Sequence, residues 1–192
     1  MPEGLFIIRL VLGLLLFAHG TQKLLGWFGG YGLEGTGGFF ESVGHKPGRL
    51  MAMVAGLSEA VGGLFLVLGF LTPWAAAMVM GTMLVAAVSV HAPHGLWATN
   101  GGYELPLVNG LVACGLAFTG AGSWSLDHAF DIPWTRGWGV GIGAIVVALI
   151  AALLVLGRRR TIADSEVEPA YPAEATPVTT ATEDVAARSR PL

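Results

Sequence analysis

Long apolar runs alternate with short polar, glycine-bearing segments along the chain. A helix needs about 20 apolar residues to cross the hydrocarbon of a bilayer, and five runs reach or approach that length. They cover residues 5–25, 50–71, 74–90, 105–119 and 138–156. Pro73 marks the end of the second run, because proline fixes its own backbone dihedral, and Arg158, Arg159 and Arg160 stop the fifth. The pattern predicts an all-α membrane protein with five transmembrane helices.

Two polar segments, residues 19–47 and 91–104, interrupt this pattern, and we expect both to form loops. The first begins inside the first span and is the densest in polar chemistry, with His19, Gln22, Lys23, Trp27, Glu34, Glu41 and His45. The second begins at His91 and ends at Glu104. Each segment follows an odd-numbered span, so both are predicted to lie on the same face of the membrane.

Lysine and arginine residues near the span ends indicate the orientation, since these residues prefer the cytoplasm. If the triple arginine after the fifth span is inside, five spans place the N terminus outside and both polar segments inside. Lys23, Lys46 and Arg49 then fall inside as well. The opposite orientation would place most basic residues on the wrong side, so we expect a cytoplasmic C-terminal tail.

Composition supports a membrane protein and excludes several other classes. The chain has 192 residues, 54% apolar and only 12% charged, with a mean hydropathy of +0.67, whereas about a quarter of the residues in soluble domains are charged. Its single cysteine, Cys114, excludes a disulfide framework or a CxxC motif within the chain. The basic residues form no stripe that would bind nucleic acid. The acidic tail at 161–192, rich in Pro, Ala and Thr, is expected to be disordered.

Glu59, near the middle of the second span, carries the strongest chemical signal. A carboxylate in the bilayer persists only when it is paired, protonated or in contact with water. At 1.5 Å per residue, His19 lies about 9 Å and Glu59 about 15 Å from the inner ends of their helices, and the two side chains lean toward each other. We therefore predict a hydrogen bond between His19 and Glu59, with Gln22 and Lys23 one turn below. Arg9 leans the other way and is expected to extend to the outer surface.

Two interpretations of this polar pair remain open. Polar side chains between transmembrane helices often serve only to hold the helices together, while ionisable groups inside the membrane often mark a ligand, quinone or proton site. Asn109, one turn into the fourth span, raises the same alternatives. His91 and His94 are separated by a proline, which disfavours a shared metal ion on one helix. No metal site is expected.

Three stretches carry a resemblance to a known family: HGTQKLLGWFGGYGLEGTGGFFESVGHKPG, AGLSEAVGGLFLVLGFLTPWAAAMVMGTML and VHAPHGLWATNGGYELPL. Together they resemble the DoxX family of small bacterial membrane proteins over roughly residues 5–126. The resemblance implies a DoxX-like four-helix membrane domain at 1–126. An outer hairpin and a fifth transmembrane helix at 127–160, followed by the disordered tail at 161–192, extend beyond that domain.

The resemblance also implies a function and a location in the bacterial plasma membrane. Family members are associated with membrane oxidoreductase systems, including a thiosulfate:quinone oxidoreductase subunit and a mycobacterial complex that links superoxide detoxification to thiol handling. The chain has no cofactor motif of its own, so quinone is the candidate redox molecule, and soluble or membrane oxidoreductases are the candidate partners beside the lipid bilayer. The first hypothesis is a redox subunit that binds quinone or a small sulfur compound near the cytoplasmic face. A scaffold for soluble enzymes and a transporter of solutes or protons are the alternatives. Candidate catalytic residues are His19 and Glu59, and candidate ligand-binding residues are Gln22, Lys23, Trp27, Glu34, Glu41, His91, Glu104 and Asn109.

Overall fold

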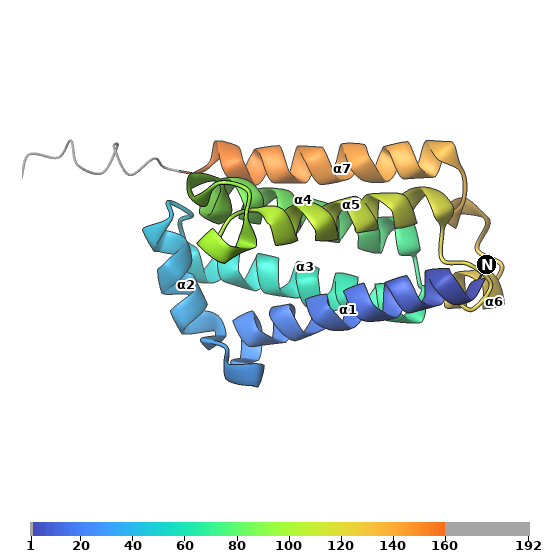
Figure 1. Ribbon diagram of the computed structural model, residues 1–192, viewed down its shortest axis with the longest axis horizontal. Coiled ribbons are helices and arrows are strands. Elements are labelled where there is room, and N and C mark those ends of the chain that lie inside the picture. The colour runs from blue at the N-terminus through green and yellow to red at the C-terminus, as the bar shows by residue number, and fades with distance from the viewer. Residues whose placement is uncertain (1, 160–192) are drawn as a thin grey trace, which may run out of the picture.

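The structure, a computed structural model, describes residues 2–159 and consists there of helices, turns and loops (Figure 1). The predicted disordered tail lies outside the described residues. Five long helices run side by side, and the short helices α2 (Gly32–Ser42) and α6 (Leu126–Ala129) lie at opposite ends of the bundle. The long helices are α1 (Pro2–Leu25), α3 (Gly48–Leu68), α4 (Thr72–Ala86), α5 (Glu104–Thr119) and α7 (Trp138–Gly157).

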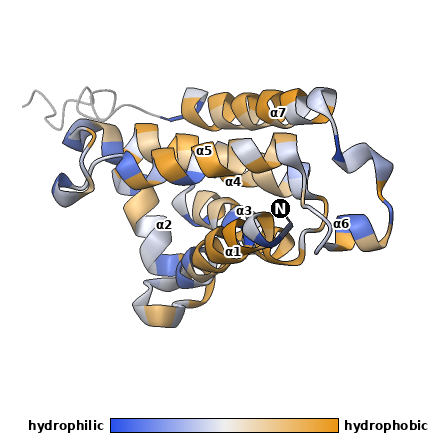
Figure 2. Cartoon of the chain, turned by 45° about the vertical axis from the view of Figure 1, so that its right-hand side comes forward, coloured by the Kyte–Doolittle hydropathy of each residue, from blue (hydrophilic) through white to orange (hydrophobic). Residues whose placement is uncertain are grey.

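The membrane character predicted from the apolar runs is confirmed. Within the described residues, α1, α3, α7 and the continuous helical segment Thr72–His94 are long and apolar enough to cross a membrane, and α5 is a shorter apolar helix of 16 residues. Hydrophobic colours cover the long helices, and the hydrophilic ones gather at the two ends of the bundle (Figure 2). Apolar side chains on the outside of the bundle are what a lipid solvent favours.

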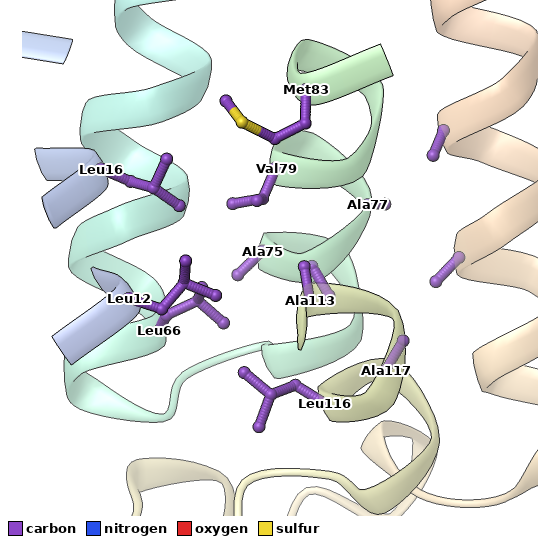
Figure 3. Packing of buried hydrophobic residues seen from close by; sticks show 13 residues of the cluster. Leu12, Leu16, Leu66, Ala75, Ala77, Val79, Met83, Ala113, Leu116 and Ala117 are labelled. Carbon is purple, nitrogen blue, oxygen red and sulfur yellow. The ribbon is translucent and has the colours of Figure 1, made fainter. Parts of the chain in front are cut away.

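Small residues set the packing of the bundle. α1 packs against α3, and α4 lies at the centre, against α3, α5 and α7. The core combines a few large side chains such as Leu16, Leu66 and Val79 with many alanines (Figure 3). Between α1 and α3 the backbones nearly touch: a Cβ added to Gly13 would lie 2.6 Å from the carbonyl oxygen of Gly63. Glycine and alanine at such crossings allow close packing, which holds helices together in lipid.

Arg9 corrects one prediction, because it is completely buried instead of extending to the outer surface. One guanidinium nitrogen, Nη1, donates to the carbonyl oxygens of Leu66 at 2.8 Å and Val67 at 3.3 Å, and Nη2 donates to that of Trp124 at 2.6 Å. The last carbonyls of a helix have no partner within the helix, and a cation there is favourable. Arg9 lies on the face of α1 that packs on α3, so it joins the end of α3 to the segment before α6.

Asp127 of α6 completes this end of the bundle. Its two carboxylate oxygens accept hydrogen bonds from the backbone amides of Leu71 at 2.7 Å and Thr72 at 3.0 Å. These amides belong to the first turn of α4, whose N–H groups have no partner inside the helix. The tight turn between α3 and α4 is therefore fixed by one buried cation and one buried anion.

The other end corrects a second prediction, since the glycine-rich segment expected to be a loop contains the 11-residue helix α2. The glycines of this helix allow it to lie directly on α3: a Cβ on Gly37 would come within 3.0 Å of the Arg49 backbone. Glu41, near the end of α2, accepts a hydrogen bond of 2.9 Å from the amide of Gly48, the first residue of α3. α2 thus covers the end of the bundle as a fixed element.

Candidate functional site

A cavity of about 450 Å³ lies between α3, α4 and α7 and extends along α4 to the end of the bundle that α2 covers. We call it the central groove. One face of α4 and of its helical continuation lines the groove from Trp74 to His91. The length of this face is about 25 Å at 1.5 Å per residue. The lining is mostly apolar, as in typical ligand pockets of this size. Its amine, carboxyl, hydroxyl and imidazole groups come from Lys23, His45, Ser58, Glu59, Thr82, Ser89 and His91.

Glu59 forms an ion pair with Lys23, and both side chains line the groove. Glu59 is 3% exposed and Lys23 is 24% exposed, so the carboxylate is enclosed while the amine keeps some access. The prediction that Glu59 is hydrogen-bonded to His19 is therefore wrong, because its partner is Lys23. Lys23 belongs to the same face of α1 as Gly20, which contacts α3, and its long side chain reaches up to the deeper carboxylate.

His19 points away from α3 and lies on the exposed surface of α1. Its Nδ1 donates to Oε1 of Gln22 at 3.1 Å, and Nε2 of Gln22 donates to the carbonyl oxygen of Phe28 at 3.2 Å. These bonds stabilise the turn that follows α1. The structure places His19 and Gln22 outside the groove lining.

A second polar cluster, missed in the sequence, closes the α2 end of the groove. His45 is 4% exposed, and its Nε2 lies 2.7 Å from Oγ of Ser89. Arg159, after α7, donates from Nε to the carbonyl oxygen of Val43 at 2.8 Å and from Nη2 to that of Ser89 at 3.2 Å. We call His45, Ser89 and Arg159 the His45 cluster. Burial, and then the positive charge of Arg159, lower the pKa of His45, so its imidazole is neutral near pH 7.

Ser89 lies in an irregular part of the α4 continuation. Residues Ala87–His91 form a π-helical turn, followed by a 3₁₀ turn at Ala92–His94. π turns are rare and occur often at functional sites. His91 also lines the groove, and its Nδ1 donates to the carbonyl oxygen of Gly101 at 2.6 Å.

The other predicted site residues lie outside the groove lining. Glu34 forms an exposed ion pair with Arg49 at 3.2 Å, and Trp27 is 53% exposed beside the end of α1. Glu41 accepts a hydrogen bond from the backbone amide of Gly48 at 2.9 Å, and Glu104 accepts one from that of Ala98 at 2.8 Å. Asn109 of α5 faces α4, with its Nδ2 4.0 Å from Sδ of Met83. Among residues 2–159, no three His, Cys, Asp or Glu side chains converge on a common metal position.

The chain is similar to several bacterial proteins. A family model described as DoxX matches residues 4–92, which include all but the first two residues of α1, the whole of α2 to α4 and most of the residues that line the groove. An uncharacterized protein of Haemophilus influenzae is 34% identical over 133 residues, covering 67% of this chain and 92% of the relative.

Two further relatives have informative names. The inner membrane protein YqjF of Escherichia coli is 29% identical over 135 residues, covering 68% of this chain and 95% of that protein. A Bacillus subtilis protein named "Putative oxidoreductase CatD" is 29% identical over 126 residues, covering 65% of this chain and 84% of that protein. No solved structure gives a significant match.

Proposed function

Because the chain belongs to the DoxX family of membrane proteins, we propose that it is a membrane subunit of a bacterial oxidoreductase or redox-homeostasis system that binds quinone in the central groove. One observation carries the proposal: an ion pair of Lys23 and Glu59 at the wall of an otherwise mostly apolar groove of about 450 Å³. Ionisable groups inside a membrane bundle typically mark a ligand or proton pathway. The name of the Bacillus subtilis relative agrees with a redox role.

The groove fits a molecule that is dissolved in the bilayer. Its apolar walls suit a ring and a hydrocarbon tail, while a small number of polar groups can orient the ring oxygens. Val54 of α3 and Val147 of α7 line the groove and are 44% and 41% exposed. The edges of the groove therefore reach the lipid-facing surface, so a ligand can enter from the side without crossing water.

The chain supplies hydrogen-bond donors and a proton-holding carboxylate. Reduction of a quinone to the quinol takes up two electrons and two protons, and the electrons have to come from a reduced sulfur compound or a partner protein. Lys23 donates a hydrogen bond through its ammonium group, which stabilises negative charge on a nearby oxygen. Glu59 holds or releases a proton beside it, as a general acid or base must.

We further propose that the α2 end faces the cytoplasm, which places the N terminus outside. Lys46, Arg49, Arg158 and Arg159 lie at or next to this end, and positive residues prefer the cytoplasmic side. In this orientation the His45 cluster lies between the groove and the cytosol.

A non-catalytic scaffold is the second candidate function. Three neighbouring aromatic residues at the α2 end, Trp27, Phe28 and Tyr31, are 53%, 69% and 86% exposed. Exposed aromatic residues can contact a soluble enzyme, although they also anchor helices at the membrane interface. Solute transport ranks last, because Leu12, Leu16 and Leu66 fill the bundle with apolar side chains.

The test is to purify the full chain in mild detergent from bacterial membranes and to measure extracted and titrated quinone by chromatography and absorbance. We expect the wild type to retain quinone and Glu59→Gln to retain at least about tenfold less. The carboxylate that holds the Lys23 ammonium in place is lost, and with it the charge-assisted bond from Lys23 to the quinone, worth roughly 1.5–3 kcal/mol. Glu34→Gln, which changes an exposed carboxylate outside the groove, is the matched control. A folded Glu59→Gln variant that binds quinone as the wild type does would refute the proposal.

A further inference from the structure

The central groove has two polar poles at different depths. One is the ion pair of Lys23 and Glu59, and the other is the pair of His45 and Ser89 at the α2 end. Counted from the turn that joins α3 to α4, Glu59 lies nine residues back from Leu68 and Ser89 lies seventeen residues on from Thr72. The difference of eight residues corresponds to about 12 Å along the bundle at 1.5 Å per residue.

The side chains narrow this separation. Side chains lean toward the N terminus of their own helix, and α3 and α4 run in opposite directions. Glu59 therefore leans toward the α2 end, and Ser89 leans away from it. Along the bundle axis, the polar atoms of the two poles are therefore expected to be closer together than the backbone positions.

A ring with two opposed carbonyl oxygens matches this gap. Two C=O bonds of about 1.23 Å on opposite sides of a six-membered ring place the oxygens roughly 5 Å apart. Hydrogen bonds of about 2.8 Å on both sides extend the span to roughly 11 Å. A compact sulfur anion is too short to reach both poles at once.

We propose that His45 and Ser89 form the second seat of the ligand, so that the groove binds a 1,4-dicarbonyl ring with one oxygen at each pole. The inference rests on quinone binding in the groove and deepens it, because it selects the para-quinone class over a small sulfur compound. When Nε2–H of His45 donates to Oγ of Ser89, the hydroxyl hydrogen of Ser89 is free to donate to a ligand oxygen. The neutral state of His45 is compatible with either direction of this bond.

Arg159 is the positioning residue of this seat. Its guanidinium bonds the carbonyl oxygens of Val43 and Ser89, and so fixes the segments that carry the imidazole and the hydroxyl. Arg159 and the whole of α7 lie beyond residues 4–92, which match the family model. This binding position thus combines Ser89, from the region that matches the family model, with Arg159, from outside it.

The competing explanation is that the His45–Ser89 bond only ties the segment after α2 to α4, as interhelical hydrogen bonds commonly do. Binding of 2-methyl-1,4-naphthoquinone to the full chain in detergent, observed by isotope-edited infrared spectroscopy, distinguishes the two. A hydrogen bond lowers the stretching frequency of the carbonyl that accepts it, so each carbonyl reports its own seat. We expect both carbonyls of the bound ligand to be shifted in the wild type.

In Ser89→Ala, one carbonyl should return to its unbonded frequency while the other stays shifted, and affinity should fall about five- to tenfold, the effect of one neutral hydrogen bond. 1-Tetralone, which has the same bicyclic skeleton with one carbonyl, should place that carbonyl at the Lys23 pole and bind equally well to both forms. Ser42→Ala, an exposed serine of α2 that bonds only the carbonyl oxygen of Phe39, is the matched control.

The outcomes separate this inference from the proposed function. If the quinone binds with only one carbonyl shifted in the wild type, the second seat is wrong and quinone binding in the groove stands. This wild-type spectrum decides the question even if Ser89→Ala does not fold. If no quinone binds, both proposals are overturned.

Discussion

Removal of Lys23 should show how much the buried ion pair contributes to the stability of the fold. In Lys23→Met the carboxylate of Glu59, only 3% exposed, loses its partner. Loss of one member of a buried pair costs about 3–5 kcal/mol, and we expect the lower value, about 3 kcal/mol, because Lys23 is 24% exposed. For a chain of this length each kcal/mol shifts the melting temperature by about 2–4 °C, so the variant should melt roughly 6–12 °C below the wild type.

The assay is thermal unfolding of the full chain in one detergent, followed by circular dichroism at 222 nm. Arg49→Met is the matched control, because it breaks the exposed pair with Glu34. The side chain of Arg49 is 70% exposed and that of Glu34 is 78% exposed. Such a surface pair contributes at most about 1 kcal/mol. The double variant Lys23→Met/Glu59→Leu should regain most of the loss, since replacing both members with apolar groups removes the uncompensated charge.

Two results would refute this reasoning. One is a Lys23→Met variant that melts no lower than Arg49→Met. The other is a double variant less stable than Lys23→Met alone, which would mean that the pair does not account for the cost.

Three further predictions concern other parts of the bundle. Arg9→Met should lower the melting temperature by a similar 6–12 °C, because the end of α3 loses its buried donor at a cost of about 3 kcal/mol. Arg136→Met, at an exposed arginine, is the control. Equal melting temperatures of the two variants would contradict the role of Arg9. The pKa of His45 is lowered by burial and by a neighbouring arginine, so below the unfolded pKa of about 6.5 the unfolded chain binds more protons and stability falls with falling pH. His45→Gln should make the melting temperature less dependent on pH between about 7.5 and 5.5, and an unchanged profile would count against the lowered pKa. Gly20→Leu should separate α1 from α3, because a Cβ at residue 20 would lie 2.6 Å from the carbonyl oxygen of Gly56. Gly115 faces open space, so Gly115→Leu should be tolerated and is the control. Chemical cross-linking of α1 to α3 measures the separation, and similar cross-linking in both variants would disprove the close packing.

The spans and the burial of Glu59 could be predicted from the sequence, because the length of an apolar run and the cost of a charge in lipid are local properties. The partner of Glu59 could not be chosen correctly from helix rise alone. Depth favoured His19, but the rotation of α1 decides which side chains face α3. Gly13 and Gly20, seven residues apart, mark that face, and Lys23 lies close to it while His19 does not. The same glycine pattern includes Arg9 and would have predicted its burial.

The His45 cluster lies beyond what a single sequence can reveal. Ser89 follows His45 by 44 residues and precedes Arg159 by 70, and no spacing along a helix relates residues on three separate segments. The helix α2 was missed for a different reason. Glycine lowers intrinsic helix propensity, but in α2 the missing side chains allow contact with the backbone of α3, and tertiary packing outweighs the propensity.

The contacts of Arg9 also bear on how the chain is inserted during synthesis. Its carbonyl acceptors are 57, 58 and 115 residues further along the chain, so the first helix leaves the ribosome before any partner of this cation has been made. A cation at bilayer depth without acceptors is costly. The N-terminal helix is therefore expected to remain beside the translocon or a chaperone until the third helix and the segment before residue 126 have been made, and to take its final place only then.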